Sequence, residues 1–188
     1  YPVRISGVSW PLRADASGAG GVIAVGVDDE TPGTLLWAWP PPVFAAFTAP
    51  GAIPVRVAAD GTDPVASSKG TEIAYGNNTL VWLRGHQVVR GTTRIWDAAT
   101  DTSRTITRAG GWPEDWSGSG ALVLTNGNER GNISVWDREG GLRKTDLTGF
   151  SPDWSPSGSR LVFTTRWYRG RGAVQSACAD GRYIRQLT

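Results

Sequence analysis

The sequence is poor in the residues that form disulfides, metal sites and many active sites. Its 188 residues include one cysteine, Cys178, one histidine, His86, and no methionine. A single cysteine excludes an intrachain disulfide, and one histidine with one cysteine cannot form a zinc site of the usual kind. A Ser-His-Asp triad would have to use His86, and no Gly-x-Ser-x-Gly elbow occurs. We therefore predict no metal, no cofactor and no catalytic residue in this chain.

Other absences bear on partners and compartment. No apolar run approaches the roughly 20 residues of a membrane-spanning helix, and no signal peptide is visible. The formal net charge is only +2, and no run of five or six basic residues occurs, so we expect no nucleic-acid partner. The sequence begins at Tyr1 without methionine, which suggests a processed or trimmed chain.

Helical periodicity is missing as well. No segment carries apolar residues at positions i, i+3, i+4 and i+7 over three turns. The 25 glycines and 12 prolines would interrupt long helices. The apolar runs are short and rich in Val, Ile, Thr and Trp, which is typical of strands. The sequence therefore predicts an all-β fold.

A phrase made of a turn and a short apolar run recurs four times. Its clearest copies occupy 151–165, with Trp154-Ser155 before the turn, and 114–125, with Trp116-Ser117. Fainter copies without the tryptophan occupy 66–75 and 16–25. Self-similarity at a period of roughly 40 to 50 residues indicates a repeat architecture.

A second repeated phrase completes the unit. Trp96-Asp97 and Trp136-Asp137 are each followed by a turn and a polar strand, and Asp180-Gly181 predicts a similar hairpin turn in the last repeat. Four short strands in about 40 residues are typical of a propeller blade. We predict a single β-propeller domain over residues 1–188 with about four four-stranded blades. The approximate repeats are 7–58, 59–108, 109–148 and 149–188.

The last repeat resembles a known family. The segments 153–158, 161–164, 179–181 and 185–188 read D-W-S-P-S-G, L-V-F-T, A-D-G and R-Q-L-T. They resemble the repeat of TolB-like, or PD40 (WD40-like), β-propellers, with Ser157 in place of the family's usual Asp and Cys178 in place of its usual acidic residue. The resemblance implies a protein or peptide partner, recognised through blade loops and the central channel. It also implies a periplasmic or extracellular location.

The number of blades in the complete ring stays open. The segment 3–7 resembles a closing strand, and the chain also ends on one, which gives five closing strands for four repeats. Three arrangements fit: an excised part of a six- or seven-bladed ring, a closed four-bladed ring, or half of a ring completed by a partner, which can be a second copy of the chain.

Tryptophans that do not recur mark candidate binding loops. We expect Trp112 on a connecting loop, and Arg166, Trp167 and Tyr168 on a loop between two strands. Exposed aromatic residues on loops bind sugars or act as hot spots for protein partners, although they can also cover a core edge.

Repeated residues have a structural explanation. The recurring tryptophans are expected to pack between blades; they are Trp96, Trp116, Trp136 and Trp154. Asp115 and Asp153 occupy equivalent positions and complete the set of candidate binding residues, although their recurrence alone could reflect the repeat.

Three functions fit these observations. The leading hypothesis is a non-catalytic module that recognises a protein or peptide. The second is a lectin-like, carbohydrate-binding propeller that uses exposed tryptophans. The third is the propeller portion of a larger secreted hydrolase whose catalytic residues lie outside this sequence.

Overall fold

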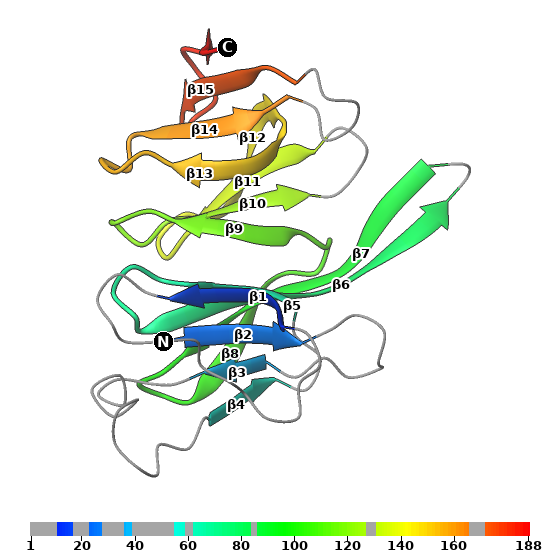
Figure 1. Cartoon of the computed structure of the whole chain (residues 1–188), viewed down its shortest axis with the longest axis vertical. Helices are drawn as coiled ribbons and strands as arrows, with labels where there is room; N and C mark the ends of the chain where they lie inside the picture. Colours follow the sequence, from blue (N-terminus) through cyan, green and yellow to red (C-terminus); the bar gives the residue numbers. More distant parts are fainter. Residues whose placement is uncertain are drawn as a thin grey trace.

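The described part of the chain consists entirely of strands, turns and loops. The computed structural model describes residues 11–16, 23–27, 36–38, 55–58, 62–83, 86–126, 131–165 and 172–188. Within these ranges the strands form four antiparallel sheets of four strands each, and every sheet follows chain order (Figure 1). The prediction of an all-β propeller built from four-stranded blades is confirmed. The described ranges contain no helix long and apolar enough to cross a bilayer.

We number the sheets as blades 1 to 4 in chain order. Blade 1 comprises β1 (Pro11–Ala16), β2 (Ile23–Val27), β3 (Leu36–Ala38) and β4 (Val55–Ala58). Blade 2 comprises β5 (Thr62–Ala66), β6 (Glu72–Leu83), β7 (His86–Asp97) and β8 (Thr102–Thr107). Blade 3 comprises β9 (Trp112–Trp116), β10 (Leu122–Asn126), β11 (Asn132–Asp137) and β12 (Gly141–Thr148). Blade 4 comprises β13 (Phe150–Trp154), β14 (Arg160–Thr164), β15 (Val174–Cys178) and β16 (Arg185–Gln186).

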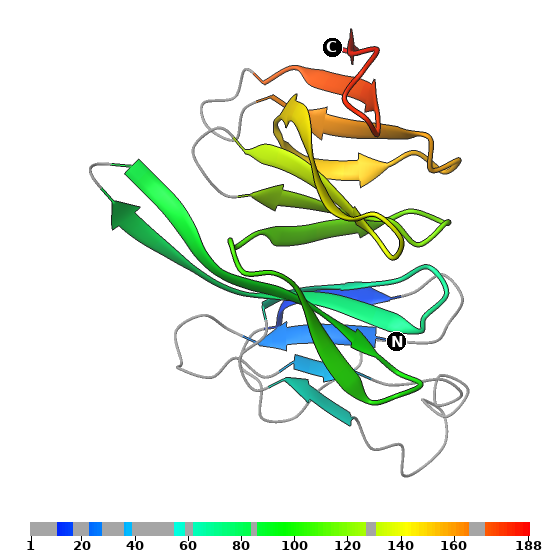
Figure 2. The ribbon, with the colours of Figure 1, turned by 180° about the vertical axis from the view of Figure 1, so that it is seen from behind.

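The blades stack in an arc. The first strands of successive blades contact one another, β1 with β5, β5 with β9 and β9 with β13. Blade 1 and blade 4 lie at opposite ends of the stack (Figures 1 and 2). The sheets do not close on themselves, so the chain is part of a propeller and the alternative of a closed four-bladed ring is wrong. The segment 3–7, which resembled a closing strand, lies outside the described residues.

The recurring Ser and Gly build the same turn in each of blades 2 to 4. In blade 3, Ser117 N donates to the Ala121 carbonyl at 2.8 Å and Ser117 Oγ accepts from Ala121 N at 2.9 Å. Gly120 N donates to the Ser117 carbonyl at 3.0 Å, with φ of 90° at Gly120. A positive φ favours glycine. The repeated phrase is therefore the turn between the first and second strands.

The Trp-Asp pairs end the third strands. Asp137 Oδ1 accepts hydrogen bonds from the backbone of Glu139 and Gly140 at 3.0 and 2.5 Å. This Asx turn starts the hairpin to the fourth strand, and Asp97 forms the same turn in blade 2. In blade 4 the equivalent position is Cys178, and the turn is instead capped by Asp180, two residues further on, whose Oδ1 accepts from Arg182 N at 3.0 Å. The predicted turn at Asp180-Gly181 is confirmed.

Two apolar clusters hold blades 2, 3 and 4 together. Alternate positions of a strand lie on opposite faces, and blade 3 is buried on both. One cluster joins blades 2 and 3 and contains Val65, Ala74, Ile95, Trp116, Leu122, Leu124 and Trp136. The other joins blades 3 and 4 and contains Val123, Ile133, Val135, Leu147, Leu161, Phe163 and Ala177. The expected packing of Trp116 and Trp136 between blades is confirmed, and their rings meet edge to face at 6.1 Å.

Candidate functional site

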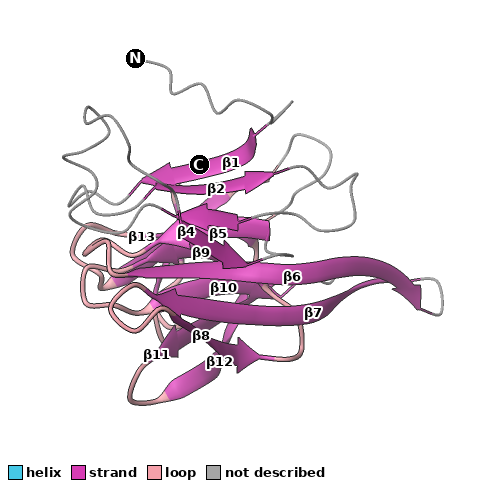
Figure 3. Cartoon of the chain, turned by 90° about the horizontal axis from the view of Figure 1, so that it is seen from below, coloured by secondary structure: helices cyan, strands magenta, loops and turns pink. Residues whose placement is uncertain are grey.

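The hairpin of blade 2 projects beyond its own sheet (Figures 1 and 3). β6 and β7 pair over twelve positions, from Glu72 with Asp97 to Leu83 with His86. Pairing of β6 with β5 stops at Gly76, and pairing of β7 with β8 begins at Thr93. Residues 77–83 and 86–92 therefore form a two-stranded ribbon, which we call the hairpin arm.

The sequence of the hairpin arm is apolar over much of its length. Leu80, Val81, Trp82 and Leu83 are consecutive in β6, and the register sets Leu80 across from Val89. A run of four consecutive apolar residues is unusual in a strand that faces solvent. An isolated two-stranded ribbon is at best marginally stable in water. This composition therefore suits a ribbon that is covered by another molecule.

Hydrogen bonds fix the base of the hairpin arm to the connection between blades 2 and 3. Asn78 Nδ2 donates to the Gly111 carbonyl at 2.8 Å, and Gly111 N donates back to Asn78 Oδ1 at 3.3 Å. Thr93 Oγ1 donates to the same carbonyl at 2.7 Å, and Gly110 N donates to the Gly91 carbonyl at 3.0 Å. Both strands of the arm are thus attached where it leaves the blade, which sets its direction.

Gly91 permits a close approach of the two strands at this base. Its φ is 152°, and a Cβ built on it would lie 1.9 Å from the carbonyl oxygen of Asn77. No side chain fits at that distance without moving the backbone. The base of the arm therefore depends on glycine at this position.

The structure places Trp112 differently from the sequence prediction. Trp112 is the first residue of β9, paired with Thr125, and it is half-buried. The prediction of a connecting loop is wrong, because the glycines before Trp112 end the connection and the strand starts at once. Trp112 therefore does not stand on a loop as a flat exposed platform.

Asp115 connects two blades. Its Oδ1 accepts a hydrogen bond from Trp116 N and its Oδ2 accepts one from Trp154 N of blade 4, both at 2.8 Å. Asp153 holds the equivalent position one blade further on and is exposed. The two aspartates thus belong to successive blades, and Asp115 has a structural role. Arg166, Trp167 and Tyr168 lie outside the described residues.

A buried carboxylate that the sequence analysis missed also joins two blades. Glu72, whose side chain is 7% exposed, forms ion pairs with Arg104 at 3.3 Å and with Arg138 of blade 3 at 2.8 Å. The Arg104 guanidinium lies over the Trp136 ring, 4.8 Å from its centroid. Nothing in the sequence marks these scattered charges as partners. The sequence does indicate the hairpin arm, because 72–83 and 86–97 are two long stretches without proline that are separated only by Arg84-Gly85.

A metal site in the described part of the chain would need a group of residues that could bind the ion. Within those ranges, no three His, Cys, Asp or Glu residues gather as they would around a metal ion. His86 is paired with Leu83 in the hairpin arm.

Comparisons with known proteins identify the fold. No protein-family model matches the sequence, and no curated protein matches it. A putative TolB from Agrobacterium tumefaciens superimposes with a TM-score of 0.65 at 18% identity, covering 93% of this chain and 60% of that one. A puromycin-hydrolyzing peptidase from Mycobacterium tuberculosis gives 0.64 at 12% identity, covering 97% and 29%. The β-propeller domain of the Trilobed protease from Pyrococcus furiosus, which has an open velcro topology, gives 0.61 at 12% identity, covering 95% and 57%. The chain therefore spans 60% or less of the length of these structures.

Proposed function

We propose that this chain, which has the fold of TolB-like β-propellers, is a non-catalytic module that binds a protein or peptide partner. The observation that carries the proposal is the hairpin arm. A rigid stack of blades holds this ribbon in a fixed direction, and in such folds the projecting segments determine what is bound.

The chemistry of the arm favours a polypeptide as the ligand. Beyond Gly76 and Thr93, no other described strand pairs with either edge of the ribbon. Backbone N–H and C=O groups along such edges can pair with an added strand, while apolar positions on the faces provide binding energy. An extended peptide or the edge of another sheet offers both. The candidate residues Arg166, Trp167 and Tyr168 stay a prediction for a second contact.

A variant without the arm tests this proposal. Gly76 and Thr93 are directly paired, so an Asn-Gly turn can replace residues 77–92 and keep the four strands of the blade, while the hydrogen bonds of Asn78 and Gly91 with residues 110–111 are lost. Peptides selected from a random library on the intact chain should bind the shortened variant at least about tenfold more weakly, which is about 1.4 kcal/mol. Fluorescence anisotropy with labelled peptides measures this loss.

The control is Lys144→Ala, which changes an exposed residue in blade 3, away from the hairpin arm. Near-ultraviolet circular dichroism of Trp116 and Trp136 checks that both variants remain folded. Equal affinity for the intact and shortened chains, or no selected peptide at all, would contradict the proposal.

A second candidate is the propeller portion of a peptidase, as in the third hypothesis from the sequence. It is supported by the TM-score of 0.64 with the mycobacterial peptidase, of which the chain covers 29%. The sequence of the complete polypeptide that contains this segment distinguishes the binding module from the peptidase. A Ser-His-Asp arrangement in the same polypeptide supports the peptidase, and its absence supports the binding module.

Two further parts of the proposal follow from the TolB-like likeness. A periplasmic or extracellular location is expected, and fractionation of source cells tests it. The lectin-like alternative loses support because Trp112 is half-buried in a strand. Binding of the chain to a glycan array tests this alternative.

A further inference from the structure

The face of blade 4 that points away from blade 3, here the outer face, corresponds position by position to faces that are buried elsewhere. The register establishes the correspondence. Ile73, Leu122 and Leu161 pair with the last residue of the first strand in blades 2, 3 and 4. The residues before them, Glu72, Ala121 and Arg160, are therefore equivalent.

In blades 2 and 3 the equivalent faces are covered by the next blade. Ala74 and Ile95 of blade 2 are fully buried against blade 3. Val123 and Val135, their equivalents in blade 3, are fully buried against blade 4. A four-stranded sheet is thus what covers this face wherever the structure shows it covered.

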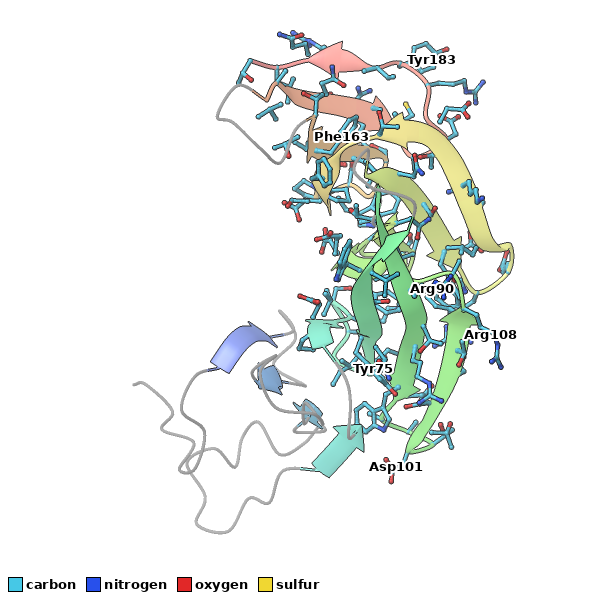
Figure 4. The ribbon with its side chains drawn as sticks, turned by 90° about the vertical axis from the view of Figure 1, so that its right-hand side faces the viewer. Tyr75, Arg90, Asp101, Arg108, Phe163 and Tyr183 are labelled. Atoms are coloured by element: carbon cyan, nitrogen blue, oxygen red, sulfur yellow. The ribbon has the colours of Figure 1, made fainter. Side chains whose placement is uncertain are left out.

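In blade 4 the same positions are less buried. Val162 stands at the position of Val123 and is only half-buried. Leu187 stands in the repeated R-x-L-T or D-L-T phrase at the position of Leu147, and it is 50% exposed where Leu147 is 2% exposed. Three large hydrophobic residues of this final segment are exposed, Tyr183, Ile184 and Leu187, and Figure 4 shows Tyr183 at the end of the arc. An apolar surface of this kind is typical of an interface.

Arg160 gives the outer face a charge. In blade 2 the equivalent residue is Glu72, which forms an ion pair with Arg138 of the covering blade at 2.8 Å. Arg160 has the opposite sign. Its contacts are neutral: Ser176 Oγ at 3.1 Å, the Tyr183 carbonyl at 3.0 Å and Cys178 Sγ at 3.8 Å. A covering sheet that matches Arg160 therefore carries a carboxylate where blade 3 carries Arg138.

We propose that the outer face of blade 4 docks a further β-sheet blade that bears a carboxylate opposite Arg160. The equivalent faces of blades 2 and 3 are each covered by a sheet, which indicates a sheet as the occupant here. Arg160 stands where blade 2 has Glu72, which indicates that the covering sheet carries a negative charge at this point. A second copy of the chain that brought the same face would introduce a second Arg160 guanidinium into the interface. This binding is separate from that of the hairpin arm, which belongs to blade 2.

A fused sheet serves as the probe. A copy of residues 108–148 is placed directly after Thr188, as these residues follow Thr107 in the chain. The basic probe keeps arginine at the copied position 138, and the acidic probe carries Arg138→Glu in the copy only. We expect the acidic probe to raise the melting temperature above that of the basic probe. It should also slow amide exchange at Leu187 by at least about tenfold relative to the unfused chain.

Arg160→Glu is the decisive variant, because it should reverse the order of the two probes. Arg160→Gln removes the charge with a smaller change and should make the two probes equal, so it keeps the test valid if Arg160→Glu does not fold. Equal melting temperatures for both probes in the wild-type chain, or unchanged exchange at Leu187, would overturn the proposal. So would a dimer of the unfused chain, seen by light scattering, that protects Leu187, because the occupant would then be a second copy.

Discussion

The interface between blades 2 and 3 and the interface between blades 3 and 4 use the same repeat in different ways. At the first, Glu72 forms a buried ion pair across the blades, and Trp116 Nε1 donates to the Val65 carbonyl at 3.0 Å. At the second, Ala121 stands where Glu72 does, and the cross-blade hydrogen bond runs from Trp154 N to the Asp115 carboxylate at 2.8 Å.

The difference shows that packing determines the stack and that polar contacts are fitted to it. Both interfaces bury the same strand positions, but their polar contacts differ. At one, the Trp116 side chain donates to the backbone carbonyl of Val65, and at the other the Asp115 side chain accepts from the backbone N–H of Trp154. The buried Trp154 Nε1 has no hydrogen-bond partner in the described part of the chain, although the equivalent Trp116 Nε1 has one. Removal of apolar contacts should therefore be more costly than removal of polar ones.

The largest effect is expected from Phe163→Ala. Phe163 is 2% exposed at the interface of blades 3 and 4, and its truncation should lower the free energy of unfolding by about 3–5 kcal/mol. Urea denaturation followed by tryptophan fluorescence measures the loss. Ile184→Ala, at a side chain that is 55% exposed, is the control and should cost under about 1 kcal/mol. Similar losses for both variants would show that blade 4 does not pack on blade 3 as described.

Asp115→Asn should have the next largest effect, about 1–3 kcal/mol. The carboxylate accepts two backbone hydrogen bonds, and an amide can accept only one of them through its oxygen. Asp153→Asn, at the exposed equivalent position, is the matched control. If the two substitutions destabilise the protein equally in urea, the bridge from Asp115 to blade 4 is not a stabilising contact.

Glu72→Gln should cost about 1–2 kcal/mol. The carboxylate is buried, but Arg104 and Arg138 are 46% and 56% exposed and can be solvated when it is removed. A double-mutant cycle with Arg138→Gln measures the coupling directly. A coupling energy near zero would mean that this ion pair does not hold blade 2 to blade 3.

The smallest effect concerns the surface turn of blade 4. Its hydrogen bond from Arg182 holds the pKa of Asp180 below the ordinary value of an aspartate. Arg182→Ala should therefore raise the pKa of Asp180, as measured by NMR titration of its carboxyl carbon. Because the folded pKa is lowered, the contact stabilises the turn above the unfolded pKa, and this contribution is lost as pH falls through the folded pKa. An unchanged pKa in the variant would exclude the contact.

The sequence predicted the parts of the structure that repeat. The Trp-Ser turns, the Trp-Asp hairpins and the inter-blade packing of Trp116 and Trp136 each follow from a local phrase that occurs more than once. Features that occur once were not predictable in the same way. Trp112 was assigned to a loop because no second copy showed that a strand starts there, and the partners of Glu72 come from β8 and from the turn after β11, which only folding brings together.

The most direct test of the account compares amide hydrogen exchange at Val135 and Ser176, which occupy equivalent positions in blades 3 and 4. The outer face of blade 4, which points away from blade 3, is an uncovered form of a face that blade 3 buries. Ser176 N should then exchange at least about tenfold faster than Val135 N, once intrinsic rates are taken into account. Equal protection of the two amides from exchange would contradict this description of blade 4. Strand β15 would then be as stable as the equivalent strand β11, although no further blade covers it.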